Sequence, residues 1–466
     1  MPKNPFENPV SQPDQTEKRE KQQVFPDVPE KFTDGYPEGY RPWPKGWSFT
    51  VDKMKEKLPD GTYKMLTLDM SIPSAELAEK VNSIPTREER AVAIGKFYTC
   101  KHNCPRCFSK TMALEDSDCF ILTWDENKKI IDQAAELGLE TVKFLEPGEL
   151  LDDPDLFKYL DYFKEKNINF SIFTKPAYLT DEVEVKKKFG LSPKEFLAKI
   201  KGYENVSLLV SFTSADPETE KKLVESSVED YSNKRNQILE MMAELGFNDD
   251  PDNQRMALIC APVLKSNIDE AFDIFKWGIK RNIPVVLAPT MVSGRGAEAE
   301  EIKSIDFKDR QLVDLWVELY DWLIKEKLMT MEQIEQEGVS PYAGFACNQF
   351  ISGMFIRMNG QVQGCPGNET QKFRHARDIK VGDREIPTGR LEEVWKNSVS
   401  YEMRKELIED GEITLTQACY AKTGGLKLLK KHDDALVPKD KGSFSEDFYA
   451  RVLETIKAKH TAETVE

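Results

Sequence analysis

The chain has 466 residues, of which 39% are hydrophobic and 10% aromatic, so it can bury a large core. It carries 65 basic and 81 acidic side chains, and the resulting net charge of −16 argues against a general nucleic-acid-binding surface. No apolar run approaches the length of a membrane span, the N-terminal region lacks the apolar segment of a signal peptide, and 8 cysteines are too few for a disulfide scaffold. We therefore expect a cytoplasmic protein that acts on neither membranes nor nucleic acids.

Residues 1–48 are rich in proline and charge and show no periodic apolar pattern, which predicts an extended segment that is disordered over residues 1–25. Within it, the sequence GYPEGYRPWPKGW places aromatic residues among prolines and glycines. We expect this stretch to form a strap on the surface of the next domain, with a substrate-facing flap as the alternative. The run at 66–72 then predicts a strand, and the run at 74–83 predicts a helix that Ser74 caps.

From residue 91 onward, strand-like and helix-like segments alternate. Strands are predicted at 91–97, 141–145, 170–174, 207–212, 256–263 and 285–289. The segments between them have helical periodicity, and two of these end in glycines suited to a helix C-cap. Such alternation indicates an α/β fold with a parallel sheet, either open or closed into part of a barrel, whose active residues lie on the loops that follow the strands.

The alternation stops after a long predicted helix at 309–329. Residues 340–425 are rich in glycine and contain three cysteines, which indicates a second, smaller unit with little regular core. The segment 443–459 predicts an amphipathic helix that docks back on the fold. We therefore place the main domain at 49–330, the smaller unit at 331–430 and a C-terminal segment at 431–466.

Three cysteines lie close together in FYTCKHNCPRCF, directly after the strand predicted at 91–97. Cys100, Cys104 and Cys107 have the spacing C-x3-C-x2-C. A four-iron cluster normally takes four cysteines, so three nearby thiolates leave one iron open to an exogenous ligand. A structural zinc site with His102 as the fourth ligand is the alternative. Because His102 lies between the cysteines, and because catalytic loops follow strands in α/β folds, the pattern favours an iron–sulfur cluster.

This segment resembles the signature of radical S-adenosylmethionine (radical SAM) enzymes, and the resemblance extends over residues 90–300. It implies a partial (βα)6 barrel of the TIM type, a [4Fe–4S] cluster held by Cys100, Cys104 and Cys107, and S-adenosylmethionine bound at the open iron. It also implies reductive cleavage of S-adenosylmethionine to a 5′-deoxyadenosyl radical, which takes a hydrogen atom from a substrate. The electron would come from a donor of the flavodoxin or ferredoxin type.

A second motif of that family follows at the expected distance, in FLEPGELL. Family members have a glycine-rich turn after the second strand that binds the amino group of the cofactor's methionine part, and Gly148 and Glu149 match this turn. The Glu149 carboxylate can accept a hydrogen bond from an ammonium group, and Gly148 allows close approach of the backbone. Glu146 and Leu150 replace the usual glycine and proline. A solvated turn carboxylate is the alternative interpretation of Glu149.

Further polar residues are candidates for contacts with the cofactor. Arg106 stands where the family usually has an aromatic residue against the adenine, and its guanidinium plane can also stack on a ring. The resemblance places Thr174, at the end of the strand predicted at 170–174, at a polar ribose or methionine contact. Ser211 and Ser214, at the end of the next strand, are candidates for contacts with the ribose hydroxyls, although such residues often only cap the following helix.

The remaining cysteines include a second group, in which Cys347 and Cys365 form a C-x12-G-x4-C arrangement around Gly360. This arrangement resembles the start of the SPASM and Twitch auxiliary-cluster domains, in which a short β-hairpin carries two cysteines. The resemblance implies one auxiliary iron–sulfur cluster, held by Cys347, Cys365 and Cys419 with an unknown fourth ligand. Three unconnected thiols and a zinc clip are the alternatives. Cys260 lies inside an apolar strand and is expected to be a small buried hydrophobe.

An auxiliary cluster can accept an electron from a substrate radical or bind the substrate. We therefore expect an enzyme that oxidises or rearranges a small metabolite or a carbohydrate-like substrate. A peptide maturase that crosslinks, epimerises or oxidises a ribosomal precursor is the runner-up, because residues 1–48 look too short and irregular for the peptide-binding domain that such enzymes often carry. A non-catalytic, metal-stabilised binding protein is the third hypothesis, and only Glu146, Leu150 and Arg106 support it.

Overall fold

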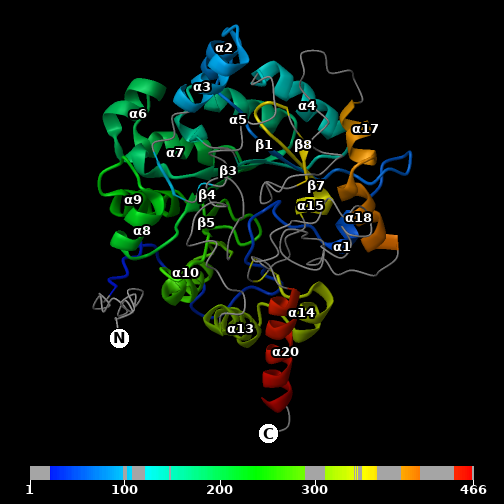
Figure 1. Cartoon of the computed structure of the whole chain (residues 1–466). Coiled ribbons are helices and arrows are strands. Elements are labelled where there is room, and N and C mark those ends of the chain that lie inside the picture. Colours follow the sequence, from blue (N-terminus) through cyan, green and yellow to red (C-terminus); the bar gives the residue numbers. More distant parts are fainter. Residues whose placement is uncertain are drawn as a thin grey trace, which may run out of the picture.

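The computed structural model describes residues 21–97, 102–105, 107, 121–145, 148–288, 310–340, 342, 344, 349–360, 362–364, 390–409 and 446–463. The strands within these residues form one eight-stranded sheet in the order β6-β5-β4-β3-β2-β1-β7-β8. Seven of these strands are parallel, and β8 runs antiparallel to β7. The sheet curls into a half-barrel with helices on its outer side (Figure 1). The predicted α/β class and partial TIM-like barrel are therefore confirmed.

The strands are β1 (Thr67–Met70), β2 (Thr141–Phe144), β3 (Asn169–Thr174), β4 (Val206–Ser211), β5 (Met256–Cys260), β6 (Val285–Leu287), β7 (Gly353–Ile356) and β8 (Val362–Gln363). The described α-helices are α1 (Val51–Met54), α2 (Ala75–Asn82), α3 (Arg87–Phe97), α4 (Trp124–Glu136), α5 (Leu156–Glu165), α6 (Glu182–Phe189), α7 (Pro193–Lys201), α8 (Pro217–Val224), α9 (Tyr231–Glu244), α10 (Ile268–Lys280), α13 (Arg310–Lys325), α14 (Met331–Glu337), α15 (Gln349–Ser352), α17 (Arg390–Lys396), α18 (Val399–Glu409) and α20 (Glu446–Glu463). Two 3-10 helices, η1 (Leu150–Asp152) and η2 (Pro176–Thr180), follow β2 and β3.

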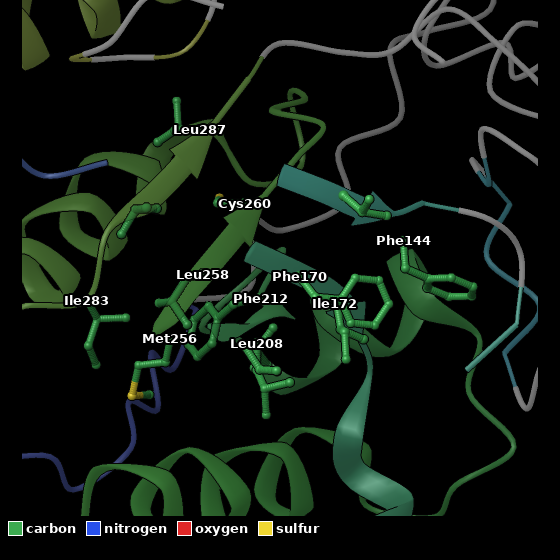
Figure 2. Close-up of a cluster of buried hydrophobic side chains, with 14 of the residues drawn as sticks. Phe144, Phe170, Ile172, Leu208, Phe212, Met256, Leu258, Cys260, Ile283 and Leu287 are labelled. Atoms are coloured by element: carbon green, nitrogen blue, oxygen red, sulfur yellow. The ribbon is translucent and has the colours of Figure 1, made fainter. Parts of the chain in front are cut away.

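The strands of the half-barrel present two different faces. Alternate side chains, among them Phe170, Ile172 and Leu208, pack with the surrounding helices into one large apolar core (Figure 2). Because successive side chains of a strand point to opposite faces, the residues between them point into the lumen of the half-barrel. Many of these residues on β1 to β4 are polar and buried: Thr67, Asp69, Thr141, Lys143, Ser171 and Ser207.

One predicted strand is wrong, because residues 91–97 form the second half of α3. Val92 is 70% exposed whereas Ile94 is 3% exposed, although a strand would place both side chains on the same face. The helix forms because strong helix formers, REER, precede these residues and because Ile94 packs against Ala78 of α2. The cysteine loop therefore follows a helix, and the first strand of the barrel is β1, at the run predicted over 66–72.

The other predicted strands all appear, as β1 to β6. Helix ends also follow the predicted chemistry: the Ser74 hydroxyl accepts a hydrogen bond of 3.1 Å from the backbone N–H of Leu77. Gly138 and Gly246, just after α4 and α9, adopt φ of +90° and +77°, the left-handed region that a helix C-cap favours. Cys260 is fully buried in the apolar core, as expected (Figure 2).

The N-terminal segment forms specific contacts from residue 21, and residues 1–20 lie outside the described part of the chain. The backbone N–H of Val24 donates to the carbonyl of Ala215 at 2.9 Å. Phe25 stacks on Trp277 of α10, with ring centroids 5.6 Å apart. The prediction of disorder is therefore wrong for residues 21–25, because packing of the Phe25 ring on α10 offsets the entropy of ordering this stretch.

The aromatic strap between residues 35 and 47 contacts both the outside of the barrel and its lumen. Tyr36 packs edge-to-face on Trp322 of α13, at 6.4 Å between ring centroids, as expected of a strap on the outside of the barrel. Trp47 instead reaches luminal side chains, because its ring lies 5.5 Å from that of Phe173 on β3 and the Lys143 Nζ lies 5.4 Å from its centroid. The end of the strap therefore belongs to the lumen.

The C-terminal part of the chain returns to the barrel. β7 pairs in parallel with β1, and β7 and β8 form the predicted hairpin, in which Gly360 adopts φ of +81°. The predicted C-terminal helix, α20, docks on α13, where the rings of Trp316 and Phe448 lie 5.9 Å apart. β7 and β8 thus continue the main sheet, although the domain boundary at residue 331 itself stays a prediction. None of the described helices is long and apolar enough to cross a membrane.

Candidate functional site

The cysteine loop is tied to the loop between α8 and α9. The backbone N–H of Cys107 donates to the carbonyl of Cys104 at 3.2 Å, which closes a turn between the two cysteines. Next to them, the backbone N–H of Asn103 donates to the carbonyl of Glu225 at 3.0 Å, and its side-chain amide donates to the Glu225 carboxylate at 2.9 Å. These bonds attach the segment that contains two of the three motif cysteines to the C-terminal end of α8. Cys100 and Arg106 lie outside the described residues.

His102 serves as an anchor for this loop. The residue is 4% exposed, its Nδ1 hydrogen-bonds the Ser226 hydroxyl at 2.9 Å, and its ring packs edge-to-face on Tyr231 of α9 at 5.5 Å between ring centroids. From the sequence, His102 is considered only as the fourth ligand of an alternative zinc site. Its contacts with Ser226 and Tyr231 explain its position inside the motif without a metal.

Cys104 lies near the segment that follows β3. Cys104 is half-buried and packs against a small cluster that contains Ala177 of η2 and Tyr231 of α9. Burial raises the pKa of Tyr231 well above its usual range, and the nearby Glu220, Cys104 and Glu149 raise it further. Cys104 packs beside Ala177 just after β3, and Thr174 at the end of β3 donates to Glu149. The structure thus brings the cysteine loop and the glycine-rich turn to one edge of the barrel.

Glu149 occupies the gap between the ends of β2 and β3. One carboxylate oxygen accepts hydrogen bonds from the Thr174 hydroxyl at 2.8 Å and the backbone N–H of Leu151 at 3.3 Å, and the other accepts from the backbone N–H of Lys175 at 2.8 Å. Gly148 precedes it with φ of +122°, a conformation that a residue with a side chain rarely adopts. The FLEPGELL turn therefore holds this carboxylate in a fixed position.

The environment of Glu149 suits a cationic ligand. Burial raises its pKa from 4.5 to about 7, although the hydrogen bonds from Lys175, Thr174 and Leu151 act in the opposite direction. A positive group placed against this carboxylate would favour its ionised form and would in turn be bound by it. The three backbone and hydroxyl donors are not what a solvated turn carboxylate would have.

The polar residues at the next strand ends have different neighbours. Thr174 is 4% exposed, and its hydroxyl donates to Glu149. Ser211, the last residue of β4, is half-buried, and strand alternation places it on the luminal face. Ser214 is completely buried, and its hydroxyl donates to the Glu270 carboxylate at 2.7 Å. Of the two serines, therefore, Ser211 lies toward the site, whereas Ser214 fixes the loop after β4.

A buried ion pair that the sequence analysis missed supports this loop from behind. Arg235 of α9 and Glu220 of α8 are fully buried and joined at 2.8 Å, and Glu220 also accepts from the backbone N–H of Ser214 at 2.8 Å. The guanidinium of Arg235 lies over the ring of Phe212, 3.7 Å from its centroid. Both charged residues lie in helices with otherwise ordinary charge patterns, so no local signal marks them as buried.

The sequence analysis also missed two charged residues inside the lumen. Asp69 on β1 and Lys143 on β2 are register partners, and their carboxylate and ammonium groups lie 3.3 Å apart. Both are almost completely buried. A signal was present, because a charge in the middle of a strand of a covered parallel sheet has no solvent to face.

The chain matches the model of the Radical SAM superfamily over residues 94–277, and no curated protein matches it. Solved structures with a similar course of the chain include SuiB of Streptococcus suis bound to its precursor peptide SuiA, with 16% identity, coverage of 81% of this chain and 75% of that chain, and a TM-score of 0.48. SuiB bound to S-adenosylmethionine shares 16% identity, with coverage of 82% and 78% and a TM-score of 0.47. The FeFe-hydrogenase maturase HydG of Carboxydothermus hydrogenoformans shares 13% identity, with coverage of 87% and 85% and a TM-score of 0.35.

All three TM-scores are below 0.5, so the family assignment rests on the matched domain and not on these structures. That domain begins within α3, contains the cysteine loop, Glu149 and Thr174, and ends within α10. Sequence motif, barrel and matched domain therefore agree that residues 94–277 form a domain of the Radical SAM superfamily, whose members are enzymes.

Proposed function

We propose that this enzyme oxidises or rearranges a small polar substrate, a metabolite or a carbohydrate-like molecule, inside the half-barrel. Enzymes of its superfamily use a [4Fe–4S] cluster and S-adenosylmethionine, which together supply a 5′-deoxyadenosyl radical that takes a hydrogen atom from the substrate. The observation that carries the proposal is the buried polar face of β1 to β4. It is supported by the contacts at the end of β3, where Thr174 donates to Glu149 and Ala177 packs with Cys104.

The residues of this edge fit the two cofactors. Cys104 and Cys107 share one turn, so with Cys100 they supply three thiolates from a single loop, as a cluster with one open iron requires. Glu149 would accept from the amino group of S-adenosylmethionine, and Thr174 would hold that carboxylate in place. A cation at Glu149 would also offset the cost of burying its charge, which the raised pKa records.

Two other residues complete this proposed cradle. The half-buried hydroxyl of Ser211 would contact the ribose, because β4 ends next to β3 and points it into the lumen. Gly148 leaves room for the backbone to approach the methionine part. Arg106, between Cys104 and Cys107 in the sequence, would stack on the adenine.

The lumen supports a compact substrate. Its polar side chains on β1 and β2 are essentially buried, and Gly46 and Trp47 of the strap lie against Thr141 and Lys143. Buried polar groups need partners of complementary polarity, which a small polar molecule provides. A precursor peptide would have to present a single side chain to the same space. A peptide substrate is therefore the alternative outcome of the test below.

An auxiliary cluster is the second part of the proposal. The cysteines Cys347, Cys365 and Cys419 lie outside the described residues, but neighbours of the first two are in contact. A Cβ on Gly364 would lie 2.2 Å from the ring of Phe350, so residues 350 and 364 approach closely. We propose that Cys347, Cys365 and Cys419 hold this cluster, and a one-electron acceptor there would make the reaction an oxidation. Electrons would enter the enzyme from a flavodoxin- or ferredoxin-type donor.

The test is anaerobic reconstitution of the full chain, with iron and zinc analysis and quantification of 5′-deoxyadenosine after addition of dithionite and S-adenosylmethionine. We expect about eight irons per chain if both clusters form, and slow release of 5′-deoxyadenosine. Cys104→Ala should abolish this product, whereas Cys260→Ala, which changes a buried thiol outside the motifs, should retain it. Zinc in place of iron without 5′-deoxyadenosine would overturn the proposal, and about four irons would remove the auxiliary cluster alone.

Substrate class is then tested with the reconstituted enzyme. Pools of small polar metabolites and of peptides are offered separately, and the rate of 5′-deoxyadenosine release is compared. Stimulation by the small-molecule pool alone supports the proposal. Stimulation by peptides alone would replace it with the peptide maturase.

A further inference from the structure

The charged pair in the lumen has a third polar neighbour, Gln349, whose hydrogen bonds are incomplete within the described residues. Asp69 and Lys143 are 1% and 3% exposed, and the Lys143 ammonium also donates to the side-chain oxygen of Gln349, the first residue of α15. Lysine cannot accept a hydrogen bond, so the amide oxygen of Gln349 must face Lys143 and its nitrogen must point away. That nitrogen is buried and has no acceptor within the described residues.

Two hydroxyls on the same strands share this property. Thr67 and Thr141 lie two residues before Asp69 and Lys143 and therefore on the same face of β1 and β2. Both side chains are fully buried, and neither hydroxyl has a hydrogen-bond partner among the described residues. Buried polar groups are nearly always paired in native proteins, so a bound molecule or water is expected here.

The balance of donors and acceptors indicates the chemistry of that molecule. At Lys143, the ammonium and the Gln349 amide nitrogen offer N–H donors, and the Thr67 and Thr141 hydroxyls, two residues earlier on the same face, can donate as well. The Asp69 carboxylate already faces the ammonium. A group that only accepts hydrogen bonds fits this surplus of donors best, and a carboxylate is such a group.

The walls around this point are aromatic. The Lys143 ammonium lies 5.4 Å from the ring centroid of Trp47, and Trp47 lies 5.5 Å from Phe173 and 5.4 Å from Tyr342. Such rings exclude water and strengthen a charge-assisted hydrogen bond to the ammonium. A bound carboxylate would thus sit beneath Trp47 of the strap, whose fluorescence would report it.

We propose that Lys143 and Gln349 form a carboxylate-binding subsite in the lumen, covered by Trp47, and that the substrate of the enzyme bears a carboxylate. The second part rests on the proposed function, whereas the first is a binding property of the folded chain. The subsite lies on β2, the strand that leads to Glu149 at the cofactor edge. It therefore defines the class of the substrate rather than a cofactor contact.

Binding is measured on the reconstituted full-length enzyme with S-adenosylmethionine present. Acetate, butyrate and succinate are titrated at constant ionic strength, tryptophan fluorescence and calorimetry are recorded, and the matching neutral amides serve as controls. We expect saturable binding of carboxylates at least about tenfold tighter than that of the amides. Trp47→Phe should remove the fluorescence response while calorimetry still detects binding.

Variants of the ion pair complete the test. Lys143→Met should abolish carboxylate binding, but it leaves Asp69 as an unpaired buried charge and risks misfolding. The double change Asp69→Asn with Lys143→Met removes both charges and should fold and fail to bind. Lys194→Met, at an exposed lysine of α7, is the matched control and should bind as the parent does. Equal binding of carboxylates and amides, absence of saturable binding, or binding by the double variant would overturn the subsite.

The outcomes separate this inference from the proposed function. The same wild-type preparation is assayed for 5′-deoxyadenosine without any carboxylate. Product without carboxylate binding leaves the radical enzyme intact and refutes the subsite. Carboxylate binding without product confirms the subsite and refutes the proposed function.

Discussion

Replacement of Thr174 by valine tests the role of Glu149 most directly. The change keeps the shape of a side chain that is 4% exposed and removes the hydroxyl that donates to Glu149 at 2.8 Å. A hydrogen bond to a charged group contributes about 1.5–3 kcal/mol, and 1.36 kcal/mol corresponds to one pKa unit. The pKa of Glu149, now about 7, should therefore rise to roughly 8 or higher.

The effect on S-adenosylmethionine binding follows from the ionised fraction of Glu149. At pH 7 about half of the wild-type carboxylate is ionised, whereas a pKa of about 8 leaves about one tenth, which weakens binding about fivefold. At pH 9 both forms are almost fully ionised, and the difference should disappear. Titration of the cofactor's own amino group is the same for both proteins and cancels in the ratio.

The assay is equilibrium binding of S-adenosylmethionine to reconstituted protein between pH 6.5 and 9. Thr174→Ser keeps the hydroxyl and should behave like the wild type. A loss of affinity in Thr174→Val that does not change with pH would refute the link to ionisation of Glu149. An equal loss in Thr174→Ser would show that the methyl group, and not the hydroxyl, is what matters.

Three further predictions concern stability, each read from urea unfolding. Because the pKa of Glu149 is raised from 4.5 to about 7 in the folded protein, folding favours its protonated form, so the free energy of unfolding should fall by at most about 3 kcal/mol as the pH rises through this range. Glu149→Gln should remove that dependence, and an unchanged profile would contradict the assignment. Arg235→Met leaves Glu220 unpaired and should cost about 3–5 kcal/mol, with partial recovery on adding Glu220→Gln. In α20, Phe448→Ala should lower the free energy of unfolding by about 3–5 kcal/mol, because Phe448 is fully buried. Lys459→Ala should lower it by less than about 1 kcal/mol, because Lys459 is a partly exposed ion-pair partner of Asp321. Equal losses would show that α20 docks through its charges.

The strands of the barrel could be predicted from the sequence because their apolar runs are short, bounded and separated by segments of helical period. Residues 91–97 show the limit of that rule. Their pattern of small and apolar residues suits a strand, and the choice of a helix depends on the REER sequence before them and on α2, against which Ile94 packs. The packing with α2 is a contact outside the segment, and a local sequence pattern cannot predict such a contact.

The candidate site divides in the same way. Cys104, Cys107 and Glu149 could be selected as candidates because the cluster and ammonium binding proposed for them demand particular residue types at particular spacings. Their supports could not, because His102 meets Ser226 and Tyr231 across more than a hundred residues of sequence. Such contacts depend on how helices of the barrel pack, and Ser and Tyr are common enough in any loop to carry no signal.

The strap shows how a residue in an apparently surface segment can shape the lumen. Gly46 adopts φ of +72°, and a Cβ there would lie 2.2 Å from the Thr141 hydroxyl, so only glycine allows the chain to pass this close to β2. That approach is what brings Trp47 over Lys143 and against Phe173. The sequence alone suggests that this proline-rich segment lies on the surface. Gly46 is nevertheless needed for Trp47 to reach the lumen. Gly46→Ala should disturb carboxylate binding, because any side chain there pushes the strap away from β2, while Gly39→Ala, with nothing within 4 Å of its Cβ and a similar φ of +74°, controls for backbone strain alone.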